Sequence, residues 1–339
     1  MLNRNKISLA LFIATVVILY PFILKAETDI FSLSLPIDCK PNETCFIQNY
    51  VDIDPSDKAV DYKCNGSTYD GHKGVDIRLL SVAETKKGVS VLASAPGIIK
   101  AMRDGMADKL ITDLNDPYIK NRQCGNGVVI DHGNGWETQY CHMLQNSILV
   151  QKGEDVKRGQ KLGNVGFSGE AQFAHVHISV RHNGKIIDPF LGNGINNSCD
   201  TIPDTRNGLW ADEVKQALTY KNGILIESGF SSVIVKPDTL EIGNTPAIPT
   251  SISTPAIIFY ARFINLQQGD KINFSITGPS GNIVSNTTKP LERNKATYVA
   301  YSGKKRPETG WAQGEYLGWV KLLRNGKIII YKEQMIKIE

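Results

Sequence analysis

The sequence predicts a mainly β chain with two β-rich domains. From about residue 62 to residue 190, and again from residue 223 to residue 339, short apolar runs alternate with turns rich in glycine, proline and asparagine. Few segments show the apolar periodicity of an amphipathic helix, whereas short runs of strand-forming residues are frequent. A chain of 339 residues accommodates two domains of ordinary size.

The N-terminal 26 residues are expected to direct export and are set apart from the fold. A basic head, MLNRNK, precedes the apolar run ISLALFIATVVILYPFIL, and KAETD restores polarity. This layout is typical of a signal peptide, with Ala26 at the cleavage position. Leu24, two residues before Ala26, is larger than the small residue that is preferred at that position of a cleavage site. The apolar run also reaches the lower length limit of a membrane span. A retained inner-membrane anchor is therefore the alternative.

Composition and charge exclude a nucleic-acid partner. Hydrophobic residues make up 41% of the chain and charged residues 21%, which are globular values. The formal net charge of +4 is too small to indicate nucleic-acid binding, and the sequence contains no long run of like charges.

The six cysteines are expected to form disulfides, because an even number in an exported chain is typical of an oxidising compartment. Cys39 and Cys45 are expected to pair because they are close in sequence, and Cys124 and Cys141 because they flank a predicted hairpin. Cys64 and Cys199 then pair by elimination. The hairpin bridge is expected to serve stability more than chemistry. Free buried cysteines or a metal site are the alternatives, although no C-x-x-C spacing indicates zinc.

The first β region is predicted to consist largely of hairpins. GVSVLASAPGIIKAM (88–102) alternates and carries a Pro-Gly break. GNGVVIDHGNGWETQYCHML (125–144) and HVHISVRHNGKIIDPF (175–190) each contain a strand, a turn with Asn-Gly and a second strand. The polar insertion at 103–123 is expected to form a surface loop or a short helix near the functional site.

Histidine and aspartate occur in three short patterns of this region. GHKGVDI places His72 four residues before Asp76, which puts both on one face at the entry of a strand. HVHISV places His175 and His177 together on one face of a strand, and YCHM contributes His142. A catalytic zinc site commonly has three imidazole or carboxylate ligands and one open position. The joint occurrence predicts one metal site.

These residues and the runs around them resemble the lysostaphin-type (LytM-like) zinc metallopeptidases, which cleave peptide cross-links of bacterial cell walls. The resemblance covers residues 60–190 in order and implies an antiparallel β peptidase domain. It implies that the Zn²⁺ ligands are His72, Asp76 and His177, and that the catalytic histidines are His142 and His175. The sequence departs from the family pattern at Met143, where leucine is usual, and in the long insertion at 103–123.

The second β region is predicted to be a sandwich of unknown role. Its strand candidates, which include SSVIVKP (231–237), are separated by Pro-Ser-Gly-Asn and Arg-Asn-Gly turns. It contains no histidine and no cysteine, so we expect a binding or scaffolding role that bond cleavage does not require. The predicted organisation is a peptidase domain at 27–200, a linker with a short helix at 201–222 and the sandwich-like domain at 223–339.

The resulting hypothesis is an exported zinc-dependent endopeptidase that acts on the peptide stems of peptidoglycan. Family analogy implies the D-alanyl–diaminopimelate cross-link, and the cysteine content favours the periplasm over an extracellular location. The alternative is a catalytically silent LytM-like regulator that binds and activates a cell-wall amidase. A cysteine hydrolase that pairs Cys141 with His142 is disfavoured, because adjacent strand residues point to opposite faces. A purely structural β protein would leave the clustered histidines unexplained.

Overall fold

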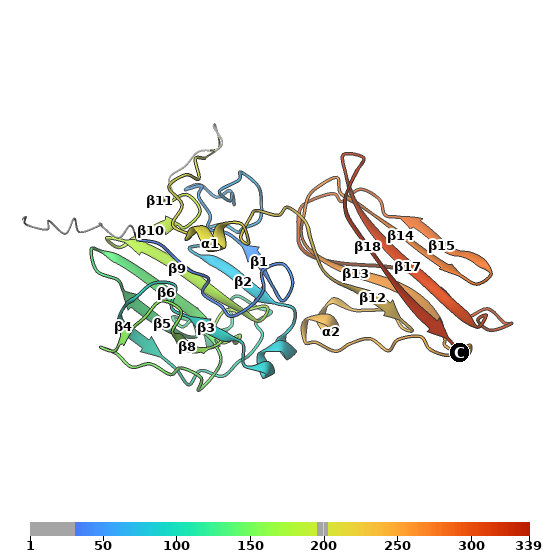
Figure 1. Cartoon of the computed structure of the whole chain (residues 1–339), viewed down its shortest axis with the longest axis horizontal. Helices are drawn as coiled ribbons and strands as arrows, with labels where there is room; N and C mark the ends of the chain where they lie inside the picture. The colour runs from blue at the N-terminus through green and yellow to red at the C-terminus, as the bar shows by residue number, and fades with distance from the viewer. Residues whose placement is uncertain (1–30, 195–198, 200–202) are drawn as a thin grey trace, which may run out of the picture. The chain divides into compact units, whose positions relative to one another are not determined.

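The computed structural model describes residues 31–194, 199 and 203–339, of which Ser32–Glu339 form one compact unit. This unit is mainly β, and its named strands pair antiparallel (Figure 1). The predicted signal peptide or anchor lies outside the described residues. Among the described helices, none has the length and apolar character needed to cross a membrane.

The first β region forms a nine-stranded sheet with the main order β1-β2-β9-β6-β5-β4-β7, to which β10 and β11 are joined through β9. Two further strands, β3 (Ser90–Leu92) and β8 (Lys161–Asn164), pair separately. Two 3-10 helices, η1 (Val82–Lys87) and η2 (Pro117–Ile119), lie in the connections. The strands of the large sheet are β1 (Cys45–Asn49), β2 (Val75–Leu79), β4 (Gly97–Arg103), β5 (Asn126–Asp131), β6 (Trp136–Met143), β7 (Asp155–Val156), β9 (His175–His182), β10 (Lys185–Asp188) and β11 (Asn193–Gly194).

Both predicted hairpins of this region are confirmed. Strands β5 and β6 pair antiparallel, and so do β9 and β10. The β9–β10 turn uses Asn183 and Gly184 with φ of 51° and 77°, the left-handed conformation that a tight hairpin turn requires. Strand β9 lies between β2 and β6, so it brings three distant parts of the sequence together.

The alternation along β9 separates the core from the site. Val176, Ile178 and Val180 are almost completely buried and belong to the apolar core. His175 and His177 occupy the alternate positions, which face the other side of the sheet. The two-residue period of the strand therefore places both imidazoles together.

The second β region consists of two sheets with orders β12-β13-β16 and β15-β14-β17-β18. Buried side chains from both sheets, among them Phe259 and Phe274, form one apolar core, as in a sandwich. The expected strand at 231–237 is absent, because β12 ends at Ser231 and Pro237 begins helix α2. The elements are β12 (Ile224–Ser231), α2 (Pro237–Glu241), β13 (Ala256–Leu266), β14 (Lys271–Gly278), β15 (Gly281–Thr287), β16 (Lys295–Lys305), β17 (Gly314–Arg324) and β18 (Lys327–Ile338).

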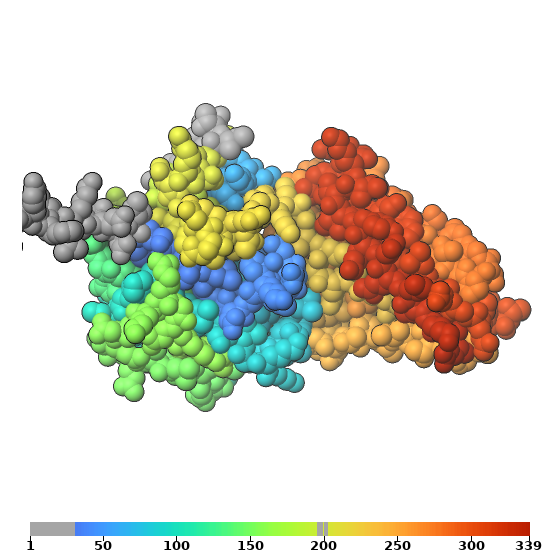
Figure 2. All heavy atoms as spheres, viewed as in Figure 1, coloured from blue at the N-terminus to red at the C-terminus, as the bar shows by residue number. Residues whose placement is uncertain are grey.

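The segment between the two regions contains a short helix and contacts the first described residues of the chain. Its helix α1 spans only Asp212–Lys215. Leu33 N donates to Leu209 O at 2.8 Å, and Trp210 and Leu218 are buried. Figure 2 shows this segment lying against the first described residues of the chain.

All three predicted disulfides are confirmed. The Cα–Cα distances are 6.0 Å for Cys39–Cys45, 5.8 Å for Cys64–Cys199 and 4.8 Å for Cys124–Cys141. The last of these bridges joins Cys124, two residues before β5, to Cys141 within β6.

Candidate metal centre and active site

Three polar side chains converge at one end of the large sheet. His72 lies in the bend before β2, Asp76 lies on β2 and His177 lies on β9, directly opposite Asp76 in the strand register. His72 Nε2 is 3.1 Å from Asp76 Oδ2 and 3.2 Å from His177 Nδ1. His177 Nδ1 is 2.8 Å from Asp76 Oδ1. The ligand atoms of the three residues all lie within 4.8 Å of one another.

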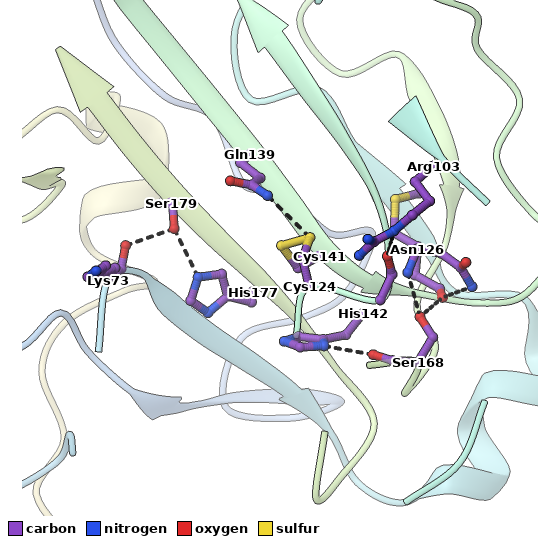
Figure 3. The surroundings of a disulfide bond; sticks show 12 residues. Lys73, Arg103, Cys124, Asn126, Gln139, Cys141, His142, Ser168, His177 and Ser179 are labelled. Carbon is purple, nitrogen blue, oxygen red and sulfur yellow. Dashed lines mark hydrogen bonds between the residues drawn. A yellow bond between two sulfur atoms is a disulfide. The ribbon is translucent and has the colours of Figure 1, made fainter. Parts of the chain in front are cut away.

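Hydrogen bonds on the far side of each imidazole determine which nitrogen carries the proton. His72 Nδ1 lies 2.6 Å from Tyr50 O, so Nδ1–H donates to this carbonyl and Nε2 carries the lone pair. Ser179 Oγ donates to Lys73 O at 2.8 Å and accepts from His177 Nε2–H at 2.9 Å (Figure 3). His177 Nδ1 therefore carries its lone pair. This arrangement is typical of histidines that bind metal.

The three facing atoms fit a zinc ion. Two imidazole lone pairs and a carboxylate approach one another to between 2.8 and 3.2 Å, where they repel unless a cation lies among them. Tetrahedral ligands of zinc are separated by about 3.3 Å when each is about 2.0–2.1 Å from the ion. Burial alone would raise the pKa of Asp76, but its interactions with the surrounding imidazoles, first His72 and also His177 through a hydrogen bond, outweigh burial and hold this pKa well below its usual range. The carboxylate is therefore ionised and available as a ligand.

The remaining two predicted site residues, His142 and His175, lie beside this triangle. Their ring centroids are 4.5 Å apart, and His142 is 5.9 Å from the ring of His177. His142 Nδ1–H donates to Ser168 O at 2.8 Å, and His175 Nδ1–H donates to Phe173 O at 2.9 Å. The Nε2 atom of each ring therefore carries a lone pair.

Burial keeps both of these imidazoles neutral. Burial lowers the pKa of His175. Burial also lowers the pKa of His142, and the nearby imidazoles of His175 and His177 lower it further, to well below its ordinary value. A neutral imidazole accepts a proton, and the resulting imidazolium returns it. All five residues that the sequence singled out are thus close together, and these two have the properties of proton carriers.

Sequence reasoning did not place the Cys124–Cys141 disulfide at this site. Cys141 is the cross-strand neighbour of His177, and Cys124 O accepts a hydrogen bond from His142 N at 2.8 Å (Figure 3). His142 has a φ of 60°, a left-handed conformation that residues other than glycine adopt infrequently. The adjacency of Cys141 and His142 in the sequence was the one available signal.

Gly74 is a second residue whose role appears only in the structure. A Cβ at this position would lie 2.5 Å from His177 Nε2 and 2.6 Å from Ile178 O. A side chain here would displace the imidazole or the backbone of β9.

An open groove of about 450 Å³ adjoins the triangle, and His142 and His177 are among its lining residues. Both signs of charge are present, because Lys73 and Arg181 lie on its wall together with Glu170. The other polar lining side chains are Tyr69, Gln123, Gln139 and Ser179. The groove has the dimensions and polarity to hold a peptide segment.

The insertion at 103–123 supports the loops of the site. Asp108 accepts from Phe167 N at 2.7 Å and from Gln145 N at 2.8 Å. These amides lie next to Ser168 and to the end of β6, which carries His142. The insertion is therefore near the site, as expected, and after the end of β4 at Arg103 it contains the short helix η2.

Residues 70–189 match the family model described as peptidase family M23. The chain is 33% identical over 106 residues to peptidoglycan DD-endopeptidase ShyA of Vibrio cholerae, a match that covers 31% of this chain and 20% of that protein. It is 26% identical over 124 residues to murein hydrolase activator NlpD of Escherichia coli, which covers 37% of this chain and 26% of that protein. The matches thus span about a quarter or less of these curated relatives.

Solved structures give weaker similarities. The catalytic domain of the M23 protein EnpA from Enterococcus faecalis is 25% identical, with a TM-score of 0.27 and coverage of 35% of this chain and 77% of that chain. The catalytic domain of lysostaphin from Staphylococcus simulans is 23% identical, with a TM-score of 0.27 and coverage of 42% and 85%.

Proposed function

Because residues 70–189 match the model of peptidase family M23, we propose that this chain is a zinc-dependent endopeptidase that hydrolyses peptide cross-links of bacterial peptidoglycan. The observation that carries the proposal is the triangle of acceptor atoms from His72, Asp76 and His177. It lies beside two neutral imidazoles and opens into a groove.

The side chains divide into metal ligands and proton carriers. His72, Asp76 and His177 would hold Zn²⁺, which would supply a Lewis acid and lower the pKa of the water bound to it. One of the pair His142 and His175 accepts the proton of the attacking water and returns it to the leaving amine. The other would take up a proton from solvent at its Nε2, donate it as a hydrogen bond to the carbonyl oxygen as negative charge develops there, and release it to solvent afterwards. The groove next to the ligands holds the peptide.

The proposed substrate is the D-alanyl–diaminopimelate cross-link. The similarity to a protein named peptidoglycan DD-endopeptidase supports this choice. Peptide stems of peptidoglycan carry several carboxylates, and Lys73 and Arg181 provide two cations on the groove wall. The three disulfides agree with export to an oxidising compartment, for which we propose the periplasm.

The alternative function is that of an activator of a cell-wall amidase. The similarity to a protein named murein hydrolase activator is the observation that favours it. An activator does not require metal ligands, however, and this chain retains a full set of three together with both neutral histidines. We therefore favour hydrolysis.

One digestion experiment separates the two functions. Purified cross-linked muropeptide dimers are incubated with the zinc-loaded protein or with Asp76→Ala, and the products are identified by mass spectrometry. The proposal expects monomers from the wild-type protein and none from Asp76→Ala. A second arm adds the protein to a cell-wall amidase. Stimulation of the amidase without any dimer cleavage would establish the activator instead.

A further inference from the structure

A buried cluster of charged residues lies outside the proposed active site. It contains two arginines, Arg78 on β2 and Arg262 on β13, whose exposed fractions are 0% and 1%. Two carboxylates accompany them, Glu227 on β12 and Glu241 at the end of α2. Fully buried arginines are rare and need partners. This cluster joins the large sheet to the second β region.

Glu241 is the carboxylate that both arginines share. Arg78 Nη2 donates to its two oxygens at 2.7 and 2.6 Å, and Arg262 Nη1 donates to it at 3.2 Å. The other donors of Arg78 are bound within its own region, by Gln48 Oε1 at 3.0 Å and Leu79 O at 3.1 Å. Glu227, in contrast to Glu241, contacts only Arg262 of the two arginines. Its Oε1 lies 3.0 Å from Arg262 Nε, and the two form an ion pair without hydrogen-bond geometry.

The opposite side of Arg78 leads to the proposed active site. Its guanidinium carbon lies 4.8 Å from the ring centroid of Phe173, in a cation–π arrangement. The Phe173 ring is 4.5 Å from the ring of His175, and Phe173 O accepts the His175 Nδ1–H bond at 2.9 Å. Arg78 and His175 are also cross-strand partners of β2 and β9. These contacts form a path from Glu241 through Arg78 and Phe173 to His175, and each of them joins buried or partly buried groups.

We propose that Arg78 is a positioning residue that keeps Phe173 and His175 in place, and that Glu241 of the second β region fixes Arg78. Glu241 determines the direction of the guanidinium, which covers the face of Phe173. The ring and the carbonyl of Phe173 then set the orientation and tautomer of His175. The second β region is thus part of the catalytic unit, contrary to the expectation that cleavage does not require it. This inference rests on the proposed function for its catalytic consequence.

The test compares two substitutions in the same cluster. Glu241→Gln keeps the size of the side chain but removes the charge that fixes Arg78. Glu227→Gln is the matched control, because Glu227 pairs with Arg262. We expect Glu241→Gln to lower kcat about tenfold with an unchanged KM and zinc content, since small misplacements of a reacting group are costly. Glu227→Gln should lower the melting temperature to a similar extent and leave kcat within about twofold of the wild type.

A double-mutant cycle tests whether the effect runs through Phe173. Phe173→Leu removes the ring but keeps the carbonyl, and it should also lower kcat. The combination of Glu241→Gln with Phe173→Leu should be no slower than Phe173→Leu alone, because both act on one path. Fully additive losses in kcat would overturn the inference.

A readout without turnover separates this inference from the proposed function. The His175 Nδ1–H signal is followed by ¹H–¹⁵N NMR, and it should shift in Glu241→Gln and Phe173→Leu but not in Glu227→Gln. If the wild type cleaves dimers while folded Glu241→Gln retains both the signal and kcat, the inference fails and the proposed function stands. If the wild type cleaves nothing, the proposed function fails and the NMR shifts alone decide the positioning role. If Glu241→Gln does not fold, an unchanged His175 signal and kcat in Phe173→Leu would overturn the inference.

Discussion

Cys141 lies directly opposite His177 in the pairing of β6 with β9. Its disulfide partner, Cys124, accepts the backbone hydrogen bond of His142 at 2.8 Å. A covalent bridge therefore lies against a proposed metal ligand on one side and a proposed catalytic histidine on the other. The bridge is part of the groove wall and is not a stabilising cross-link far from the site.

Replacement of both Cys124 and Cys141 by serine should reduce activity as well as stability. A bridge over such a loop contributes about 2–4 kcal/mol to stability. His142 also needs a constrained backbone, because its φ is 60°, and release of Cys124 O would let it relax. We expect a loss in kcat at temperatures where the variant is fully folded. The control is the Cys39→Ser, Cys45→Ser protein, which opens a loop before β1 and should lose stability without a matching loss in kcat.

Metal binding and proton transfer should separate between two histidines on the same strand face. His177→Ala removes a ligand atom and should lose most of its zinc, because two ligands hold the ion poorly. His175→Ala should keep zinc near one equivalent and still lose about two to four powers of ten in kcat. Zinc stoichiometry and turnover are measured on both proteins. Loss of zinc from His175→Ala with retention in His177→Ala would reverse the assignment.

Ser179→Ala should weaken zinc binding without removing a ligand. Ser179 Oγ accepts the Nε2–H of His177 and donates to Lys73 O, and this relay keeps the lone pair on Nδ1. Loss of such an outer hydrogen bond typically costs about 10–100-fold in metal affinity. Competition with a chromophoric chelator measures the change. An unchanged affinity would show that the Asp76 contact alone orients His177.

The site was largely predictable because local rules determine it. A strand has a two-residue period, so His175 and His177 had to share a face, and an Asn-Gly turn fixed the hairpin that follows. The alternating pattern likewise placed Val176 and Ile178 in the core. These features depend on residues close in sequence, and the structure confirms them.

Features that depend on distant partners could not be predicted. The proton positions on His72 and His177 follow from Tyr50 O and Ser179 Oγ, whose locations only the fold determines. Glu241 meets Arg78 across 163 residues of sequence. The nearby segment 231–237 looked like a strand because of its valines, but Pro237 begins a helix there instead.

Asp188 should make the stability of the protein fall as the pH rises. Its side chain is buried at the end of β10, with Oδ1 bound to Phe190 N at 2.6 Å and Leu191 N at 3.0 Å, while Oδ2 has no hydrogen-bond partner. Burial raises the pKa of this carboxyl to about 7, whereas an unfolded chain gives about 3.9. Between these two values the folded state holds a proton that the unfolded state has released.

The free energy of unfolding should therefore decrease from about pH 4 to about pH 7, by at most about 1.4 kcal/mol per pH unit from this one group. Asp188→Asn keeps the Oδ1 acceptor for Phe190 N and Leu191 N but cannot titrate. Denaturant unfolding at pH 5 and pH 8 is compared for the two proteins, both free of metal so that zinc binding does not contribute. The wild type should lose more stability than Asp188→Asn over this interval. Equal losses would mean that Asp188 is already ionised in the folded state at pH 5.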